Sequence, residues 1–409
     1  MNQINFKFHG HACVEIEYDG FRIMTDPWFG TPIFFESLVA YPPVTRPTAL
    51  ELDRINMIHI SHIHRDHFDP DSLKFFKKNT PVLISDYENK NLRQQLSNLG
   101  FKTIIEVTES GVEFGPAQFH SFQHQPFNGS FDSLIVITIS GRKILLNNDC
   151  ILSEERYKKM AEKLGPVEYG FLGYCSVSPF PTCYTVGGIS NQDLAKAEKE
   201  NAFLHVKSLD LLFSFRQIIP YANGLRLGRG KNRDHVNSHF QTVEDFIKIP
   251  QLNNKIYYCE PGQSWTENFE PQNHLFLDLV PTRYSTELQG QQVATVKSNN
   301  ALPAVTYLEF LKSYFLSLEK RIDPDWKIAI ILGSETELNK LAFLVHQERV
   351  QLVLKYEDCD IELQFDISSF NDIVLKKRSI ASIFYSFQFQ AKYKFLPKAR
   401  NEKVHTWYL

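Results

Sequence analysis

The H-x-H-x-D-H motif that begins at His62, directly after the apolar stretch 55–60, constrains this chain more than any other feature. Residues i and i+2 of an extended segment point to the same side, so His62 and His64 can bind one metal ion together. The chain then turns, which lets Asp66 and His67 reach a second ion. Imidazole and carboxylate groups suit zinc, iron and related ions. The motif therefore predicts a dinuclear metal site at a strand end.

The remaining metal ligands must come from later strand ends, because four side chains cannot complete two coordination spheres. His124 follows a β-like stretch and is the first candidate, with His120, inside that stretch, as its rival. Asp149 follows another apolar stretch, where a carboxylate can bridge two ions. Late in the chain His235 is the candidate, with His239 as its rival. These residues complete a set of seven expected ligands.

With these residues in view, the chain resembles the metallo-β-lactamase superfamily over about residues 4–260. Within that superfamily it is most similar to the metal-binding part of CMP-N-acetylneuraminate hydroxylases. It is similar, more loosely, to L-ascorbate-6-phosphate lactonases and N-acyl-phosphatidylethanolamine phospholipase D enzymes. The similarity rests on Gly10-His11-Ala12, Thr25-Asp26-Pro27-Trp28, residues 60–67, residues 143–150 and the region around Phe180-Pro181-Thr182.

The resemblance implies an α/β fold, a four-layered αβ/βα sandwich, and a division of the ligands between two ions. One ion would be held by His62, His64 and His124, the other by Asp66, His67 and His235, with Asp149 as the bridge. Asp26 would orient a ligand from behind. The expected cofactor is a pair of divalent ions, zinc or iron, with manganese as a further option.

The length of 409 residues allows two or three domains. We expect a metal-binding catalytic domain at 1–285 and a smaller α+β domain of unknown role at 300–409, after a polar linker around 280–303. The pattern of apolar residues predicts strands and helices in both parts. In the first part these are strands at 4–8, 13–18, 21–25, 55–60, 81–85, 101–105, 117–122, 133–139, 143–146 and 218–221, and helices at 71–77, 88–98 and 191–217. In the second they are helices at 306–320 and 335–346 and strands at 326–332, 349–356 and 360–366.

The composition and charge of the chain argue against some classes of binding partner. The net charge of −3 gives no electrostatic reason to expect nucleic acid. No apolar run approaches the roughly 20 residues that span a bilayer, so no transmembrane segment is expected. The six cysteines show no C-x-x-C spacing, and the first residues do not resemble a signal peptide, which favours a cytoplasmic protein. A homo-oligomer is compatible with this chain.

A basic segment precedes His235 and is the candidate substrate-binding feature. Its cations would suit a phosphate or carboxylate group, and the alternative is a solvated basic loop. These cations are Arg226, Arg229, Lys231 and Arg233. Three other features have two readings each: His11 braces the site or is a turn histidine, Cys150 is a ligand or a buried thiol, and Tyr174 and Tyr184 line a pocket or pack in loops.

The first expected function is hydrolysis of an anionic metabolite, such as a phosphorylated or nucleotide-linked sugar or a lipid. Two ions acidify a water, and the resulting metal-bound hydroxide attacks a carbonyl or phosphorus centre, with Asp66 or Asp149 positioning it. The alternative is a di-iron oxygenase, similar to the hydroxylases, that uses a separate electron-transfer partner. This chain shows no Rieske pattern of two Cys and two His, so the hydrolase ranks first. A non-catalytic metal-stabilised scaffold ranks last.

Overall fold

The computed structural model describes most of the first 268 residues and parts of the remainder. The described residues are 3–30, 32–33, 38–124, 132–174, 183–186, 189–222, 224–228, 233–252, 254–268, 302–316, 327–333, 341–346, 349–353, 359–365, 367–375 and 389–393.

Two mixed β-sheets form the centre of the N-terminal part. The first sheet has the order β16 (Ser264–Thr266), β1 (Asn5–Gly10), β2 (Cys13–Tyr18), β3 (Phe21–Thr25), β5 (Met57–Ile60), β6 (Val82–Ser85) and β7 (Ile104–Val107). The second has the order β14 (Gln217–Pro220), β12 (Tyr169–Leu172), β11 (Arg142–Leu146), β10 (Ser133–Ile139), β9 (Ala117–Gln123) and β8 (Val112–Phe114). In each sheet, antiparallel hairpins are continued by parallel strands.

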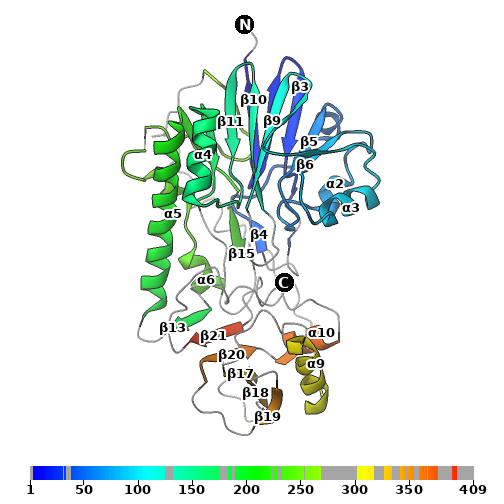
Figure 1. Ribbon diagram of the computed structural model, residues 1–409, viewed down its shortest axis with the longest axis vertical. Coiled ribbons are helices and arrows are strands. Elements are labelled where there is room, and N and C mark those ends of the chain that lie inside the picture. Colours follow the sequence, from blue (N-terminus) through cyan, green and yellow to red (C-terminus); the bar gives the residue numbers. More distant parts are fainter. Residues whose placement is uncertain are drawn as a thin grey trace.

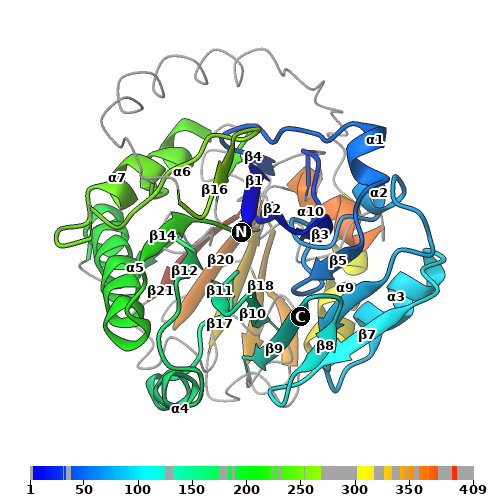
Figure 2. The same ribbon diagram turned by 90° about the horizontal axis from the view of Figure 1, so that it is seen from above.

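Helices cover the outer face of each sheet, as both views show (Figures 1 and 2). Beside the first sheet lie α1 (Ala49–Leu52), α2 (Pro70–Leu73) and α3 (Asn91–Asn98). Beside the second lie α4 (Glu154–Leu164) and α5 (Asn191–Phe213), with α6 (Arg233–His239) and α7 (Val243–Ile247) near its end. The order helices, sheet, sheet, helices is the expected four-layered αβ/βα sandwich.

Strand β10 shows why the sequence builds this sandwich. Side chains alternate between the two faces of a strand. Ile135 and Ile137 are fully buried between the two sheets, together with Phe6 of β1. Leu134 and Val136 point to the other face and join the core that Phe213 of α5 also enters. The uninterrupted apolar run of this strand is thus explained by burial on both faces.

A third sheet contains most of the described C-terminal strands. Its order is β13 (Tyr184–Val186), β21 (Phe389–Tyr393), β20 (Ile361–Phe365), β17 (Ile328–Leu332), β18 (Leu341–His346) and β19 (Arg349–Val353), and its helices are α9 (Ala304–Leu316) and α10 (Ile367–Val374). The strand β13 comes from the N-terminal part and pairs in parallel with β21. The expected boundary between 1–285 and 300–409 therefore stays a prediction, since this sheet draws on both segments.

The predicted helix at 335–346 is wrong, because residues 341–346 form the strand β18. This strand pairs with β17 on one side and β19 on the other. Its run Leu-Ala-Phe-Leu-Val is short and apolar, and such a run fits a buried strand as well as a helix by periodicity alone. Here the pairing with a strand on each side determines that this segment is a strand and not a helix.

Other boundaries differ by a few residues from those expected. The helix expected at 71–77 is the single turn α2, which begins at Pro70 because Asp69 caps it. The strand expected at 101–105 is β7, Ile104–Val107. The helix α4 was not predicted, although Ser153 is its N-cap and Glu154 and Glu155 lie in its first turn.

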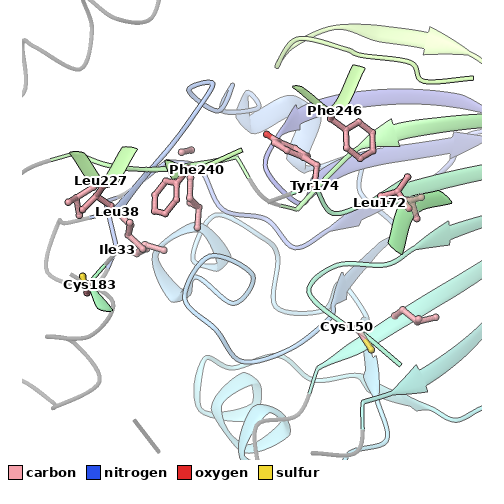
Figure 3. Close-up of a cluster of buried hydrophobic side chains, with 14 of the residues drawn as sticks. Ile33, Leu38, Cys150, Leu172, Tyr174, Cys183, Leu227, Phe240 and Phe246 are labelled. Carbon is pink, nitrogen blue, oxygen red and sulfur yellow. The ribbon is translucent and has the colours of Figure 1, made fainter. Parts of the chain in front are cut away.

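A short ribbon of β4 (Leu38–Ala40) and β15 (Leu225–Leu227) lies between the sandwich and the third sheet (Figure 1). Figure 3 shows its side chains Leu38 and Leu227 near Ile33, Phe240 and Cys183. These residues belong to one buried cluster that continues into Ile328 and Ile330 of β17. The C-terminal sheet thus packs on the sandwich through a continuous apolar core.

Among the residues that the structure describes, no helix is both long enough and apolar enough to cross a membrane.

Candidate metal centre

Five of the seven expected ligands gather at one edge of the sandwich: His62, His64, Asp66, His67 and Asp149. Strands β1, β3 and β5 run in the same direction, so the residues that follow them, His11, Asp26 and Ser61, meet there. The second sheet meets the first at this edge, because Ser133 Oγ donates to the Ser61 carbonyl over 2.8 Å and the Ala222 amide donates to the His11 carbonyl over 3.0 Å. The edge lies toward the β4–β15 ribbon (Figure 1).

Sharp turns at the strand ends aim side chains into this edge. Among the residues with a left-handed backbone, which non-glycine residues rarely adopt, are His11 (φ 51°), Asp26 (φ 34°) and Asn148 (φ 49°). Each of these three directly follows, or lies within two residues of, the end of β1, β3 or β11. Left-handed non-glycine residues cluster at functional sites, where the surrounding structure holds them in place.

His62, His64 and Asp149 form the first group of donors. Their ligand atoms all lie within 4.8 Å of one another. Nε2 of His62 is 2.8 Å from Nδ1 of His64 and 3.8 Å from Oδ2 of Asp149. His62 is fully buried, whereas 30% of the Asp149 side chain is exposed. Two imidazoles and one carboxylate with an open side are the composition of a catalytic metal site.

His11, Asp66 and His67 form the second group, again with ligand atoms within 4.8 Å of one another. Oδ2 of Asp66 is 3.3 Å from Nε2 of His11 and 3.7 Å from Nε2 of His67. All three residues are buried. Two of them were expected as ligands from the sequence, whereas His11 was expected to brace the site or to be a core or turn histidine.

Asp149 lies between the two groups. Its Oδ2 is 3.8 Å from Nε2 of His62 and 3.5 Å from Nε2 of His67. The structure thus places this carboxylate where the sequence-based prediction of a bridge requires it, although the bridging itself stays a prediction.

Asp26 and Ser61 contact the Nδ1 atoms of the two buried imidazoles, those of His62 and His67. Asp26 Oδ2 is 2.7 Å from Nδ1 of His67 and accepts from the Ser61 hydroxyl over 2.6 Å. The Ser61 oxygen is in turn 2.9 Å from Nδ1 of His62. Since Ser61 donates its own proton to Asp26, it accepts one from His62. In the neutral form that binds metal, both imidazoles would then carry their proton on Nδ1 and turn a bare Nε2 toward the site.

The main chain at Ser61 is fixed by hydroxyl groups from two other elements. Its carbonyl accepts from the hydroxyl of Tyr87 and from that of Ser133. Its amide donates to Oδ1 of Asp26 over 2.7 Å. The segment that carries the motif is therefore held in one conformation, as precise metal coordination requires.

The electrostatics of the edge favour a cation. Burial lowers the pKa of His62, and the neighbouring imidazoles of His67 and His64 lower it further, so His62 stays neutral. Burial alone would lower the pKa of His67, but the carboxylates of Asp149 and Asp66 and a hydrogen bond to Asp26 outweigh it and raise that pKa. A positive charge on His67 is thus stabilised by carboxylates, which would stabilise metal ions at the same place.

Several buried nitrogen and oxygen atoms at this edge have no hydrogen-bond partner among the described residues, which fits a site for metal ions. Buried side-chain nitrogen and oxygen atoms normally have hydrogen-bond partners. Several at this edge have none: Nε2 of His67, both ring nitrogens of His11, Oδ1 of Asp149 and Oδ1 of Asp132. These are donor atoms of the kinds that bind zinc, iron and manganese, so the residues fit a pair of divalent ions.

His124 lies at the same edge, but no described contact places its ring in either donor group. Its amide donates to the Asp132 carbonyl over 2.8 Å, and its charge acts on the Asp132 carboxyl group. Its rival His120 lies within β9, with Nδ1 3.2 Å from the Glu109 carbonyl and its ring packed near Gly111. The geometry therefore favours His124 over His120 as a residue of this edge.

His235 belongs to helix α6, and its side chain lies outside the described residues, as does that of Arg233. Arg229 and Lys231 lie outside them altogether. Arg226 is described and is buried, with its guanidinium 5.0 Å from the Tyr41 ring centroid and bonded to the Leu225 carbonyl over 2.8 Å. These contacts fit a structural role for Arg226, and its role in substrate binding stays a prediction.

The structure describes the surroundings of Cys150 and Tyr174, for which the sequence left two interpretations each. Cys150 is fully buried, its pKa is raised by burial, and its thiol contacts the Phe122 carbonyl at 3.8 Å, which fits a structural thiol. Tyr174 packs against Phe246 at 5.6 Å, as Figure 3 shows. The side chain of Tyr184 lies outside the described residues.

Sequence reasoning missed two residues of this site. Ser61 connects Asp26 to His62, and its position before the motif was the available signal. Asp132 lies beside the first group, with Oδ1 3.6 Å from Nε2 of His62, and it had no signal because it precedes an apolar stretch of the sequence rather than following one.

Comparison with known proteins agrees with this geometry. Residues 5–131 match the family model described as Beta-lactamase superfamily domain. This part of the chain is therefore a domain of that superfamily, and the resemblance found in the sequence is confirmed.

Three relatives match shorter or longer parts of the chain. A Mycolicibacterium smegmatis protein whose name describes a Rieske 2Fe-2S iron-sulfur protein is 36% identical over 102 residues, 25% of this chain and 20% of that protein. Cytidine monophosphate-N-acetylneuraminic acid hydroxylase of Mus musculus is 25% identical over 233 residues, 54% of this chain and 39% of the hydroxylase. The mitochondrial N-acyl-phosphatidylethanolamine-hydrolyzing phospholipase D of Saccharomyces cerevisiae is 28% identical over 101 residues, 24% and 21% of the two chains.

The chain spans between about a fifth and two fifths of the length of these relatives. Among solved structures, CmlA, a diiron β-hydroxylase from Streptomyces venezuelae, is similar with a TM-score of 0.43 and 18% identity, covering 65% of this chain and 54% of that chain. The family match and the donor groups together support a metal-dependent enzyme of the metallo-β-lactamase fold.

Proposed function

We propose that this protein is a dinuclear metal-dependent hydrolase that acts on an anionic metabolite. The observation that carries the proposal is the place of Asp149, whose Oδ2 lies within 3.8 Å of His62 and 3.5 Å of His67, one imidazole from each donor group. A carboxylate shared between two groups is what a pair of closely spaced ions needs.

Two bound divalent ions would supply Lewis acidity and a water acidified to near-neutral pKa. The chain's own residues prepare that chemistry. The hydrogen bonds from Asp26 through Ser61 keep Nε2 of His62 and of His67 available, and the charges of Asp66 and Asp149 compensate the ions. The 30% exposure of the Asp149 side chain leaves an open side for substrate.

The expectation of an anionic substrate rests on charge. Two divalent ions attract phosphate and carboxylate groups, and the basic residues Arg229 and Lys231 precede His235 in the sequence. Phosphoesters and lactones of phosphorylated or nucleotide-linked sugars, and phospholipids, are the substrates to screen first.

The mutational test compares two histidines of similar chemistry. His64→Ala should abolish both metal retention and hydrolysis, because it removes a donor of the first group. His120→Ala is the matched control, since that imidazole contacts the Glu109 carbonyl and lies in neither donor group. Full activity in His64→Ala would refute the proposal, as would equal losses in both variants.

The second candidate is a di-iron oxygenase with a separate electron-transfer partner. It is favoured by the similarity to the mouse hydroxylase, which extends over 233 residues and so exceeds the 101 residues matched in the phospholipase. Each donor group also has two imidazoles and one carboxylate, a set that binds iron in oxygenases as well as zinc in hydrolases. Substrate oxidation by the iron-loaded protein, dependent on O₂ and an added reductase, would support this candidate over the hydrolase.

A further inference from the structure

His11 occupies a strained and firmly held turn at the edge of the metal centre. It follows Gly10 between β1 and β2 with a left-handed backbone, φ 51°. The turn is fixed on both sides: the His11 carbonyl accepts from the Ala222 amide over 3.0 Å, and the Ala12 carbonyl accepts from the hydroxyls of Thr25 and Tyr221 over 2.7 and 2.6 Å. These hydrogen bonds thus hold a strained backbone conformation that points the His11 side chain toward the metal centre.

The imidazole of His11 is buried, and its nearest polar neighbour is a carboxylate. Its side chain is 1% exposed, Nε2 lies at ion-pair distance from Asp66, and neither ring nitrogen has a hydrogen bond of good geometry. The ring meets the rings of Trp28 and His67 edge to face, with centroids 5.4 and 5.0 Å away. A buried imidazole without a well-formed hydrogen bond is costly, and an ion shared between this ring and the neighbouring carboxylate would offset that cost.

The geometry around His11 identifies that ion as a cation. Its Nε2 is 3.3 Å from Oδ2 of Asp66, and the ligand atoms of His11, Asp66 and His67 lie within 4.8 Å of one another. An ion in their midst would contact two imidazoles and one carboxylate. The first group, His62, His64 and Asp149, has the same composition.

We propose that His11 is a direct ligand of the metal ion that Asp66 and His67 hold. The inference rests on the metal centre of the proposed function, and it does not depend on whether the reaction is hydrolysis or oxidation. In the competing account His11 would only support the Asp66 carboxylate from behind, without touching the ion.

The test removes the imidazole and keeps the backbone. His11→Asn is suitable because asparagine tolerates the left-handed conformation better than most residues. His9→Asn is the matched control: His9 is two residues earlier on β1 and equally buried, but its Nδ1 is 3.2 Å from the Thr45 carbonyl and it belongs to neither donor group. Metal content after dialysis and zinc affinity by chelator competition are measured for both variants and the wild type.

We expect two ions in the wild type and in His9→Asn, and about one in His11→Asn, with the weaker ion bound more than about 100-fold less tightly than in the wild type, beyond the range for loss of a supporting residue. Thermal unfolding of the metal-free proteins checks that both variants fold, because His11→Asn also removes the ring contacts with Trp28 and His67. Two ions with wild-type affinities in His11→Asn, or a loss of only about 10–100-fold as for a supporting residue, would overturn the assignment. Fewer than two ions in the wild type would instead contradict the dinuclear centre itself.

A second measurement needs no variant. Anomalous diffraction from zinc-soaked wild-type crystals should show an ion about 2.0–2.1 Å from a ring nitrogen of His11, the usual zinc–nitrogen distance. An ion bound by Asp66 and His67 but more than 3 Å from the His11 ring, the order of a hydrogen-bond distance, would overturn the proposal while leaving the metal centre intact.

Discussion

Asp26 and His67 form a fully buried hydrogen-bonded pair, with Oδ2 of the aspartate 2.7 Å from Nδ1 of the imidazole. The two residues follow different strands of the first sheet, β3 and β5, which run in parallel and end at the same edge. Because the carboxylate accepts the Nδ1 proton, the other ring nitrogen faces Asp66 and Asp149. The first sheet thus positions a proposed metal ligand through a partner that lies outside both donor groups.

Asp26→Asn should weaken metal binding without removing any ligand. The amide cannot accept from both His67 and Ser61 as the carboxylate does. His67 is therefore held less firmly, and its Nε2 becomes less basic. Loss of such a supporting residue reduces metal affinity by about 10–100-fold. Chelator competition measures the effect, with Asp53→Asn, on an exposed side chain, as control. Unchanged affinity in Asp26→Asn would contradict the role assigned to this pair.

Ser61→Ala should have a smaller effect that is confined to His62. The hydroxyl links Nδ1 of His62 to Asp26, whereas the Asp26–His67 bond does not need it. We therefore expect one of the two ions to be bound more weakly, by about tenfold, the lower end for a supporting residue. Stepwise titration with zinc distinguishes the two ions. Equal weakening of both ions would show that Ser61 acts on the whole edge.

Asp149→Ala should remove both ions or bring their affinities down together. Its carboxylate is the described group that approaches an imidazole of each donor group. Asp86→Ala, at an exposed position outside both groups, is the control. The metal content of both variants decides the matter: loss of one ion alone from Asp149→Ala would argue against a shared carboxylate.

Glu51 predicts a pH dependence of stability away from the metal centre. Hydrogen bonds from Lys7 and from the Thr48 cap lower its pKa from 4.5 to about 2. A lowered pKa in the folded state stabilises the protein above pH 4.5, and this contribution disappears as the pH falls through 2. Glu51→Gln should therefore be less stable than the wild type at pH 7, by about 1 kcal/mol at most for a partly exposed group, and equally stable near pH 2. A difference between the two proteins that is the same at both pH values would contradict this.

Ile135→Ala tests the core between the two sheets. Ile135 is fully buried there, so its truncation should cost about 2–5 kcal/mol of the free energy of unfolding. Thr138→Ala, on the same strand at a partly exposed position, should cost much less. Denaturant unfolding of the metal-free proteins compares them, and similar losses in both would show that the sandwich core is not packed as described.

The sequence predicted those parts of the site that are local. The motif from His62 to His67 carries its own spacing, and Asp149 follows an apolar strand, so the order of residues along the chain is enough to place both at strand ends. The four-layered sandwich followed from the resemblance and from alternation along strands such as β10. Residues that pair across the molecule carry no such local signal.

His11 and Asp132 are residues of the site whose places could not be predicted from the sequence alone. The role of His11 depends on a left-handed turn and on the distance of 3.3 Å to Asp66, which is 55 positions further along the chain and in another strand end. Asp132 depends on the meeting of the two sheets. The strand β18 was mistaken for a helix because pairing with β17 and β19, and not its own periodicity, decides its conformation.

The metal content of the wild-type protein, purified anaerobically and measured by mass spectrometry, tests the central claim most directly. The two donor groups and the carboxylate of Asp149 between them predict two ions per chain. Zinc or manganese would favour the hydrolase, and iron whose absorption changes with O₂ and reductant would favour the oxygenase. No bound metal, or a single ion that cannot be raised to two by added zinc, manganese or iron, would contradict a dinuclear centre.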